Sequence, residues 1–207
     1  MIGIIDYNAG NITSVEHALR SLKIDFIRSK NPTDLENCNK LIFPGVGDAD
    51  YAMDQLKKTG FDTFIKKWVA DNKPLMGICL GSQIIFDWSE EGNTDCLGLI
   101  QGKIKHFYTI NPELKTQEIK VPQIGWNNLT YQNGDCPILR GLNPNADFYF
   151  VHSYVICPQD ESVIKAYADY GIKVPAVIQK GNLYACQFHP EKSGPEGLKI
   201  LSNFCGE

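Results

Sequence analysis

The chain has 207 residues, of which 43% are hydrophobic and 21% are charged, and its formal net charge at pH 7 is −4. This composition is typical of an ordinary globular protein and argues against a disordered, collagen-like or coiled-coil chain, so we expect a single domain over residues 1–207. Positive charge is not clustered and no apolar run approaches the ~20 residues of a membrane helix, so neither nucleic acid nor a membrane is an expected partner.

In the first half of the chain, short apolar segments alternate with helical patterns. Residues 2–6 predict a buried strand, and the apolar spacing from Ile12 to Leu22 predicts a helix that is capped by Asn11 or Thr13. Further strands are expected at 25–28, 41–43 and 74–79, with the strand at 41–43 stopping at Pro44, and further helices are expected at about 61–69 and 81–90. Strand and helix alternating through short connections predict a parallel α/β sheet.

The second half of the chain has a different pattern. Strands are expected at 103–108, 117–121, 148–154, 163–168, 176–179 and 183–188 without intervening helices, and a closing helix is expected around 198–205. The predicted fold class is therefore α/β, with a central, mostly parallel sheet flanked by helices and with additional antiparallel strands in the C-terminal half.

One of the seven cysteines lies in a context typical of a nucleophile. The cysteine number is odd and no CxxC pair occurs, so we expect neither a disulfide framework nor a metal site, and the thiols suit a reducing, cytoplasmic location. Cys79 lies in Gly77-Ile78-Cys79-Leu80-Gly81, between an apolar strand and a helical pattern. This is the cysteine form of the G-x-S-x-G elbow, in which side chains at the glycines would collide with neighbouring elements. A bare GxCxG is more often a buried structural cysteine, and its position between strand and helix favours function.

A cysteine nucleophile needs a base, and the best candidate among the four histidines is His189. His189-Pro190-Glu191 follows the last strand directly, where the proline fixes the chain so that imidazole and carboxylate project together. His17 and His106 are interpreted as surface residues, and His152 as a pocket or interface residue. The third element is Pro44-Gly45-Val46-Gly47, a candidate oxyanion hole whose alternative interpretation is an ordinary turn.

With Ser82 and Gln83 after the elbow and with the HPE triplet, the chain resembles the class I glutamine amidotransferases over essentially its whole length. Within that family it is similar to the glutaminase subunits of imidazole glycerol phosphate synthase. The narrower motifs that carry this resemblance are Asp6-Tyr7 with Ala9-Gly10-Asn11, Pro44-Gly45-Val46-Gly47, Gly125-Trp126-Asn127, residues 150–154 and residues 189–193.

The resemblance implies roles for particular residues. Cys79 would attack the side-chain amide of glutamine, His189 would relay the proton and Glu191 would hold His189, with no cofactor. Ammonia would pass to a cyclase subunit with a (β/α)₈ barrel, in a heterodimer. The remaining implied positions are an oxyanion hole at Gly45, Val46 and Leu80, glutamine contacts at Gln83, Glu91 and Ser153, and partner contacts at Asn11, Trp126, Tyr149 and Lys192.

The chain departs from the family pattern at Asn8, Asp48, Ser82 and Gln123, and several of these positions lie near the expected partner face. An alternative is therefore a paralogue that supplies ammonia for sugar amidation in surface-glycan synthesis. Two further alternatives are a different cysteine hydrolase on the same elbow and a binding protein with a decayed triad. Gln83 and residues 151–154 argue against the hydrolase, and the complete triad argues against decay.

Overall fold

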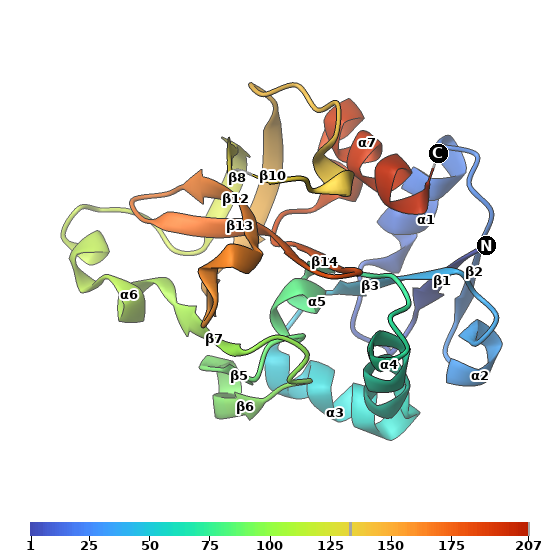
Figure 1. Ribbon diagram of the computed structural model, residues 1–207. Helices are drawn as coiled ribbons and strands as arrows, with labels where there is room; N and C mark the ends of the chain where they lie inside the picture. The colour runs from blue at the N-terminus through green and yellow to red at the C-terminus, as the bar shows by residue number, and fades with distance from the viewer. Residues whose placement is uncertain (133, 207) are drawn as a thin grey trace.

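The structure, a computed structural model, describes residues 1–132 and 134–206. Among these residues the largest element is an eight-stranded sheet in the order β2-β1-β3-β4-β14-β13-β12-β9 (Figure 1). Strands β2 to β14 in this order run parallel, and β13, β12 and β9 continue the sheet in antiparallel fashion. The strand bounds are β1 (Ile2–Ile5), β2 (Phe26–Ser29), β3 (Lys40–Gly45), β4 (Leu75–Cys79), β9 (Thr130–Tyr131), β12 (Ile164–Asp169), β13 (Lys173–Lys180) and β14 (Leu183–Cys186).

Two smaller sheets accompany the large one within the described residues. One is the antiparallel pair β10-β8, and the other has the order β11-β7-β5-β6. Their strands are β5 (Trp88–Ser89), β6 (Thr94–Asp95), β7 (Gly102–His106), β8 (Gln123–Asn128), β10 (Asp147–His152) and β11 (Tyr154–Pro158). The predicted fold class, with a mostly parallel centre and antiparallel strands in the C-terminal half, is confirmed.

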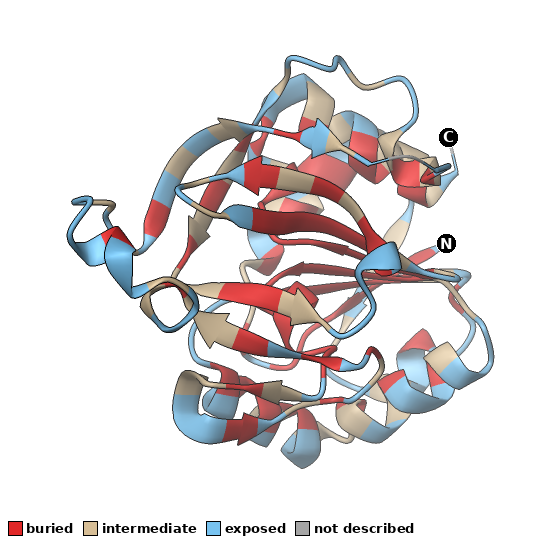
Figure 2. Ribbon diagram, turned by 60° about the vertical axis from the view of Figure 1, so that its left-hand side comes forward, coloured by how far each residue is buried: buried red, intermediate tan, exposed pale blue. Residues whose placement is uncertain are grey.

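Helices cover both faces of the large sheet (Figures 1 and 2). Helices α1 (Ile12–Ser21) and α7 (Gly194–Cys205) share one apolar core with the sheet, and α3 (Ala49–Thr59) and α4 (Phe61–Ala70) share the other. None of the described helices is long and apolar enough to cross a bilayer. The shorter elements are α2 (Pro32–Leu35), α5 (Leu80–Gln83), α6 (Phe107–Ile110) and 3₁₀ turns at Glu91–Asn93, Pro112–Lys115, Pro137–Leu139, Glu161–Val163 and Pro190–Lys192.

The helix expected over 81–90 is wrong, because α5 ends at Gln83 after a single turn. The following segment, residues 84–86, is fully buried, and its carbonyls accept backbone hydrogen bonds from residues 97–100. The carbonyls of residues 84–86 are therefore not available as acceptors for the hydrogen bonds of a longer helix. The helix α3 was not among the expected elements.

Three strand expectations also need correction. Residues 117–121 form no strand, because the hydroxyls of Tyr108 and Tyr170 take the carbonyls of Ile119 and Lys120 that a neighbouring strand would have paired. The strand expected over 148–154 is divided at Ser153, where the chain passes from one small sheet to the other. Strand β3 does not stop at Pro44 but continues to Gly45, because its last residues pair with Ile78 and Cys79 of β4.

The parallel strands β3, β4 and β14 end side by side, with Gly45 facing Cys79. The carboxyl ends of parallel strands are where α/β sheets bind ligands, because loops and helix N-termini converge there. The candidate catalytic residues all follow these strand ends.

Candidate active site

Cys79 lies at a sharp turn between β4 and α5. Its backbone is strained, with φ 54° and ψ −112°, in a region that residues other than glycine rarely adopt. The flanking glycines make this turn possible, since an added Cβ at Gly77 would lie 2.6 Å from the carbonyl oxygen of Gly81. A Cβ at Gly81 would lie 2.0 Å from the carbonyl oxygen of Phe43. The elbow thus presents Cys79 at the first turn of a helix, as the sequence predicts.

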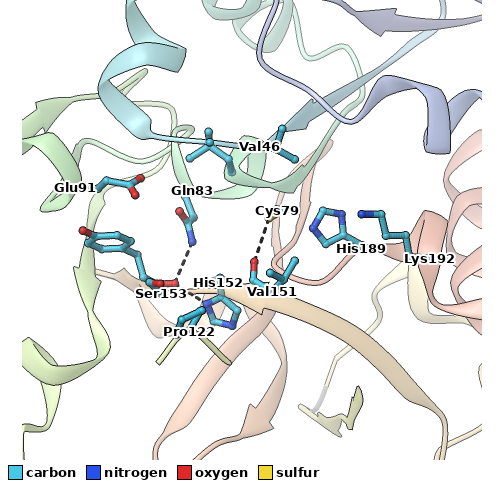
Figure 3. A pocket seen from close by; sticks show the side chains of 13 residues that line it. Val46, Cys79, Gln83, Glu91, Pro122, Val151, His152, Ser153, His189 and Lys192 are labelled. Carbon is cyan, nitrogen blue, oxygen red and sulfur yellow. Dashed lines mark hydrogen bonds between the residues drawn. The ribbon is translucent and has the colours of Figure 1, made fainter. Parts of the chain in front are cut away.

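His189 and Glu191 form a buried pair, and His189 lies beside Cys79 in the pocket (Figure 3). The Nδ1 atom of His189 lies 2.7 Å from Oε1 of Glu191, and its Nε2 atom hydrogen-bonds to no other described residue. Burial alone would lower the pKa of His189. The nearby Cys79 and the Glu191 carboxylate outweigh burial, and they raise the pKa to about 9. The arrangement favours an imidazolium next to the sulfur.

The turn that carries His189 is anchored to β10. The backbone N–H of His189 donates to the carbonyl of Tyr149, and the N–H of Tyr149 donates to Oγ of Ser193. The Ser193 hydroxyl in turn donates to the carbonyl of His189 at 2.6 Å. These hydrogen bonds hold the backbone of His189 in place and so help to position its imidazole.

A pocket of about 350 Å³ opens above Cys79 and His189 (Figure 3). The candidate glutamine contacts Gln83, Glu91 and Ser153 all line it. The amide nitrogen of Gln83 donates to the Tyr154 carbonyl at 3.0 Å and to the Gln187 side chain at 2.9 Å. The other lining residues are Val46, Gly47, Leu80, Pro122, Val151, His152, Tyr154 and Lys192.

Glu91 is the carboxylate of the pocket. One of its oxygens accepts from the backbone N–H of Ala49, the first residue of α3, at 3.0 Å. Burial raises its pKa, and the neighbouring Asp48 and Asp50 add to the rise while the Ala49 bond opposes it. The pocket therefore has an acidic end, suited to a cationic group of a substrate.

The backbone N–H groups of the candidate oxyanion donors Leu80 and Val46 differ in whether they are already hydrogen-bonded. Leu80 begins α5 directly after the nucleophile, where helix N–H groups have no partners within the helix. The N–H of Val46, in contrast, donates to the carbonyl of Ala9 at 3.1 Å. Val46 thus lines the pocket while its N–H is bonded elsewhere.

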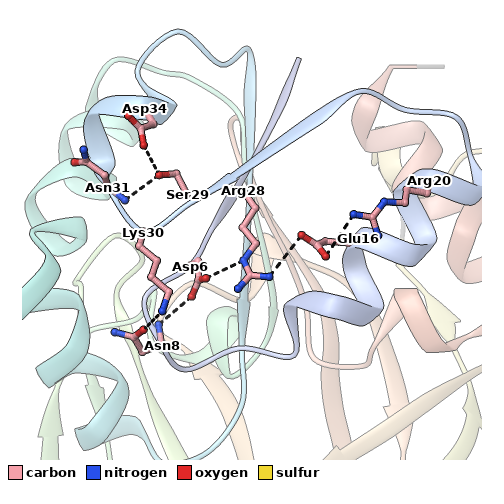
Figure 4. Close-up of polar contacts among 9 residues, drawn as sticks. All are labelled: Asp6, Asn8, Glu16, Arg20, Arg28, Ser29, Lys30, Asn31 and Asp34. Carbon is pink, nitrogen blue, oxygen red and sulfur yellow. Dashed lines mark hydrogen bonds and ion pairs between the residues drawn. The ribbon is translucent and has the colours of Figure 1, made fainter.

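The segment that presents the Ala9 carbonyl is braced by polar contacts (Figure 4). Buried Asp6 accepts from Nε of Arg28 at 2.8 Å and from the N–H of Asn8 at 3.3 Å. Lys30 donates to the Asn8 side chain at 2.8 Å, which holds the left-handed backbone of Asn8. The acceptor that holds Val46 is therefore tied to β1 and β2.

The candidate partner contacts lie outside the pocket, with one exception. Trp126 on β8 pairs with Tyr149 on β10, with ring centroids 5.9 Å apart, and Trp126 is 58% exposed. Asn11 occupies the N-cap position of α1, where it accepts from the Ser14 hydroxyl at 3.2 Å. Exposed Lys192 is the exception, because it reaches the pocket.

The sequence assigned no role at the site to Gln187, or to Tyr7, which it quoted only as part of a motif, and both contact the site. Gln187 supports Gln83, and its only sequence signal is its position two residues before His189. His152, which the sequence assigned to the pocket or the interface, lines the pocket, with its Nε2 atom 3.0 Å from the Gln123 side chain. Burial lowers the pKa of His152 to about 4, so the ring is neutral at pH 7 and is a poorer base than His189.

Comparison with known proteins identifies the family. The family model "Glutamine amidotransferase class-I" matches residues 3–207. The chain belongs to the class I glutamine amidotransferases. It is 46% identical to the imidazole glycerol phosphate synthase subunit HisH of Geobacillus kaustophilus, over 100% of this chain and 96% of that protein. It is also 44% identical to the HisH subunit of Prochlorococcus marinus strain MIT 9211, over 98% of this chain and 92% of that protein.

Solved structures support the amidotransferase fold. A crystal structure of a glutamine amidotransferase has a TM-score of 0.73 at 19% identity and covers 100% of this chain and 99% of that one. A chain in the structure of PurLQS from Thermotoga maritima has a TM-score of 0.71 at 17% identity, with 98% and 96% covered. The resemblance inferred from the sequence is therefore confirmed at the level of family and fold, and the chain is a glutamine amidotransferase.

Proposed function

We propose that this chain is the glutaminase subunit of an imidazole glycerol phosphate synthase, acting in the cytoplasm in histidine biosynthesis. The observation that carries the proposal is the strained Cys79 beside the His189–Glu191 pair, in a chain 44–46% identical to HisH subunits. These relatives do not favour the alternative of an amidotransferase for surface glycans.

The reaction begins with attack of the Cys79 thiolate on the side-chain amide carbon of glutamine. The C–N bond breaks as His189 gives its proton to the leaving nitrogen, so ammonia departs and a γ-glutamyl thioester remains. Water then adds to the thioester and gives a proton to His189, and glutamate leaves as the thiolate reforms. Glu191 holds the imidazole and stabilises its charged form through the 2.7 Å contact.

Binding of glutamine is assigned to the walls of the pocket. Glu91 at the acidic end suits the α-ammonium group, and Gln83 and Ser153 line the path to Cys79. The oxyanion is assigned to the N–H groups of Leu80 and Val46, with Gly45 preceding Val46 on the strand. Because the Val46 N–H is bonded to Ala9, this second donor must leave that carbonyl before it can act.

Ammonia is proposed to pass to a cyclase subunit in a heterodimer. The exposed Trp126 ring and the half-buried Tyr149 ring, with Asn11 and Lys192, form the proposed contact surface. Exposed aromatic residues supply much of the binding energy of protein interfaces.

Glutamate release from glutamine tests the proposal, measured for the chain alone and with the cyclase subunit of the same organism plus an acceptor analogue. We expect strong stimulation by the cyclase. Cys79→Ala should abolish the activity without loss of the fold, and Cys157→Ala, at a half-buried cysteine outside the pocket, should retain it. Near wild-type release by Cys79→Ala would contradict the chemistry. An active chain that the cyclase does not stimulate would contradict the partner.

A further inference from the structure

The hydroxyl of Tyr7 is buried just beyond β1 and has no hydrogen-bond partner among the described residues. The ring packs against Phe43, with centroids 5.3 Å apart, and a phenylalanine would make the same contact. A buried hydroxyl without a partner is costly, because its bonds to water are lost and nothing replaces them. Packing therefore explains the ring of Tyr7 but not its hydroxyl.

This hydroxyl lies against the strand that carries the proposed oxyanion donor. A Cβ added at Gly45 would lie 2.7 Å from the Tyr7 oxygen and 2.6 Å from the backbone nitrogen of Gly81, at the first turn of α5. Burial raises the pKa of the Tyr7 phenol well above its usual value, and Cys79 adds to the rise. Tyr7 thus keeps its proton and is available as a neutral donor next to Gly45.

The Gly45–Val46 peptide has to turn before its N–H can face an oxyanion, because that N–H now donates to Ala9. In a planar trans peptide the N–H and C=O groups point in opposite directions. Turning the peptide away from Ala9 therefore carries the Gly45 carbonyl to the side on which the Ala9 carbonyl lies, and the Tyr7 oxygen lies beside Gly45. The Ala9 carbonyl can only accept, so the displaced carbonyl needs another donor. Glycine at position 45, whose ψ angle changes as this peptide turns, gives the backbone freedom on that side of the peptide.

We propose that in the turned form the Tyr7 hydroxyl donates a hydrogen bond to the Gly45 carbonyl, which makes Tyr7 a positioning residue of the oxyanion strand. The inference rests on the proposed glutaminase function and deepens it. Tyr7 acts through the population of the turned form, since its hydroxyl makes no hydrogen bond to the Cys79 thiol and Tyr7 does not line the glutamine pocket.

Tyr7→Phe tests the proposal, because it removes one oxygen and keeps the ring. For the chain alone, whose structure has the unturned form, we expect kcat for glutamine hydrolysis to fall about threefold to tenfold, equivalent to one hydrogen bond, at unchanged KM. Alkylation of Cys79 by iodoacetamide, which forms no oxyanion, should keep its rate, as followed by mass spectrometry of the peptide. The free energy of unfolding should stay the same or rise, because the variant lacks a buried unpartnered hydroxyl.

Tyr131→Phe is the matched control. The Tyr131 hydroxyl is also buried without a partner among the described residues, but it lies on β9 at the edge of the large sheet, and its removal should leave kcat unchanged. Wild-type kcat in Tyr7→Phe would overturn the inference. A fall in kcat with slower alkylation or lower stability would also overturn it, since that pattern marks a structural defect. A wild-type chain without glutaminase activity would instead contradict the proposed function, and the inference with it.

Discussion

The imidazole of His189 lies between a carboxylate and a sulfur, and this position determines how the protein responds to pH. Its pKa is raised from 6.5 to about 9, so the folded state binds the proton more tightly than the unfolded chain does. The resulting stabilisation is complete below pH 6.5 and is lost as the pH rises through 9.

We therefore expect His189→Gln to remove a pH-dependent part of stability. The difference in free energy of unfolding between wild type and variant should shrink by about 2–3 kcal/mol between pH 7 and pH 10. Chemical denaturation at several pH values measures this difference. His17→Gln, at an exposed histidine on α1, should run parallel to wild type. If the His189→Gln profile also runs parallel, the imidazolium is not stabilised by its neighbours.

At the scale of elements, the brace between β1 and β2 determines where the Ala9 carbonyl lies. Arg28→Met leaves the buried Asp6 carboxylate without its cation and should lower the free energy of unfolding at pH 7 by about 1–3 kcal/mol. Arg20→Met is the control. Arg20 is exposed and forms a 3.7 Å ion pair with Glu16 on the same helix, so this substitution should lower the free energy of unfolding by less than about 0.5 kcal/mol. Equal losses in urea denaturation would show that Asp6 does not depend on Arg28.

At the scale of the whole molecule, exposed apolar side chains gather near the mouth of the pocket. Trp126 and Ile124 are 58% and 61% exposed on β8, and Val46 is 37% exposed. Trp126→Ala should weaken binding of the cyclase subunit about tenfold or more while changing the free energy of unfolding by less than about 1 kcal/mol. Calorimetric titration measures the first quantity and denaturation the second. Ile110→Ala, at a residue lining a different cavity, should bind normally. An unfolded Trp126→Ala would mark the indole as part of the core.

The sequence by itself determined the fold class, a mostly parallel sheet flanked by helices, and the position of the elbow that carries the candidate nucleophile Cys79. The spacing of apolar residues indicates which face of each element is buried. The glycines around Cys79 indicate that the backbone there packs closely against neighbouring backbone, where any side chain would clash. The prediction failed at residues 84–86 and 117–121. There, backbone carbonyls accept hydrogen bonds from residues distant in the sequence and not from the expected helix or strand. The role of each proposed site residue, and the single domain, stay predictions.

Only the tertiary structure decided the state of the site. Two of its features are hydrogen bonds between residues far apart in the sequence, from Val46 to Ala9 and from Arg28 to Asp6. A third is the buried hydroxyl of Tyr7, whose burial no sequence pattern indicates. Periodicity and motifs describe each segment alone. The direction of the Val46 N–H, in contrast, depends on the Ala9 carbonyl, which the fold places 3.1 Å from the Val46 nitrogen. Candidate residues for the chemistry can therefore be proposed from the sequence, but whether the N–H of the proposed oxyanion donor Val46 is free depends on packing between strands.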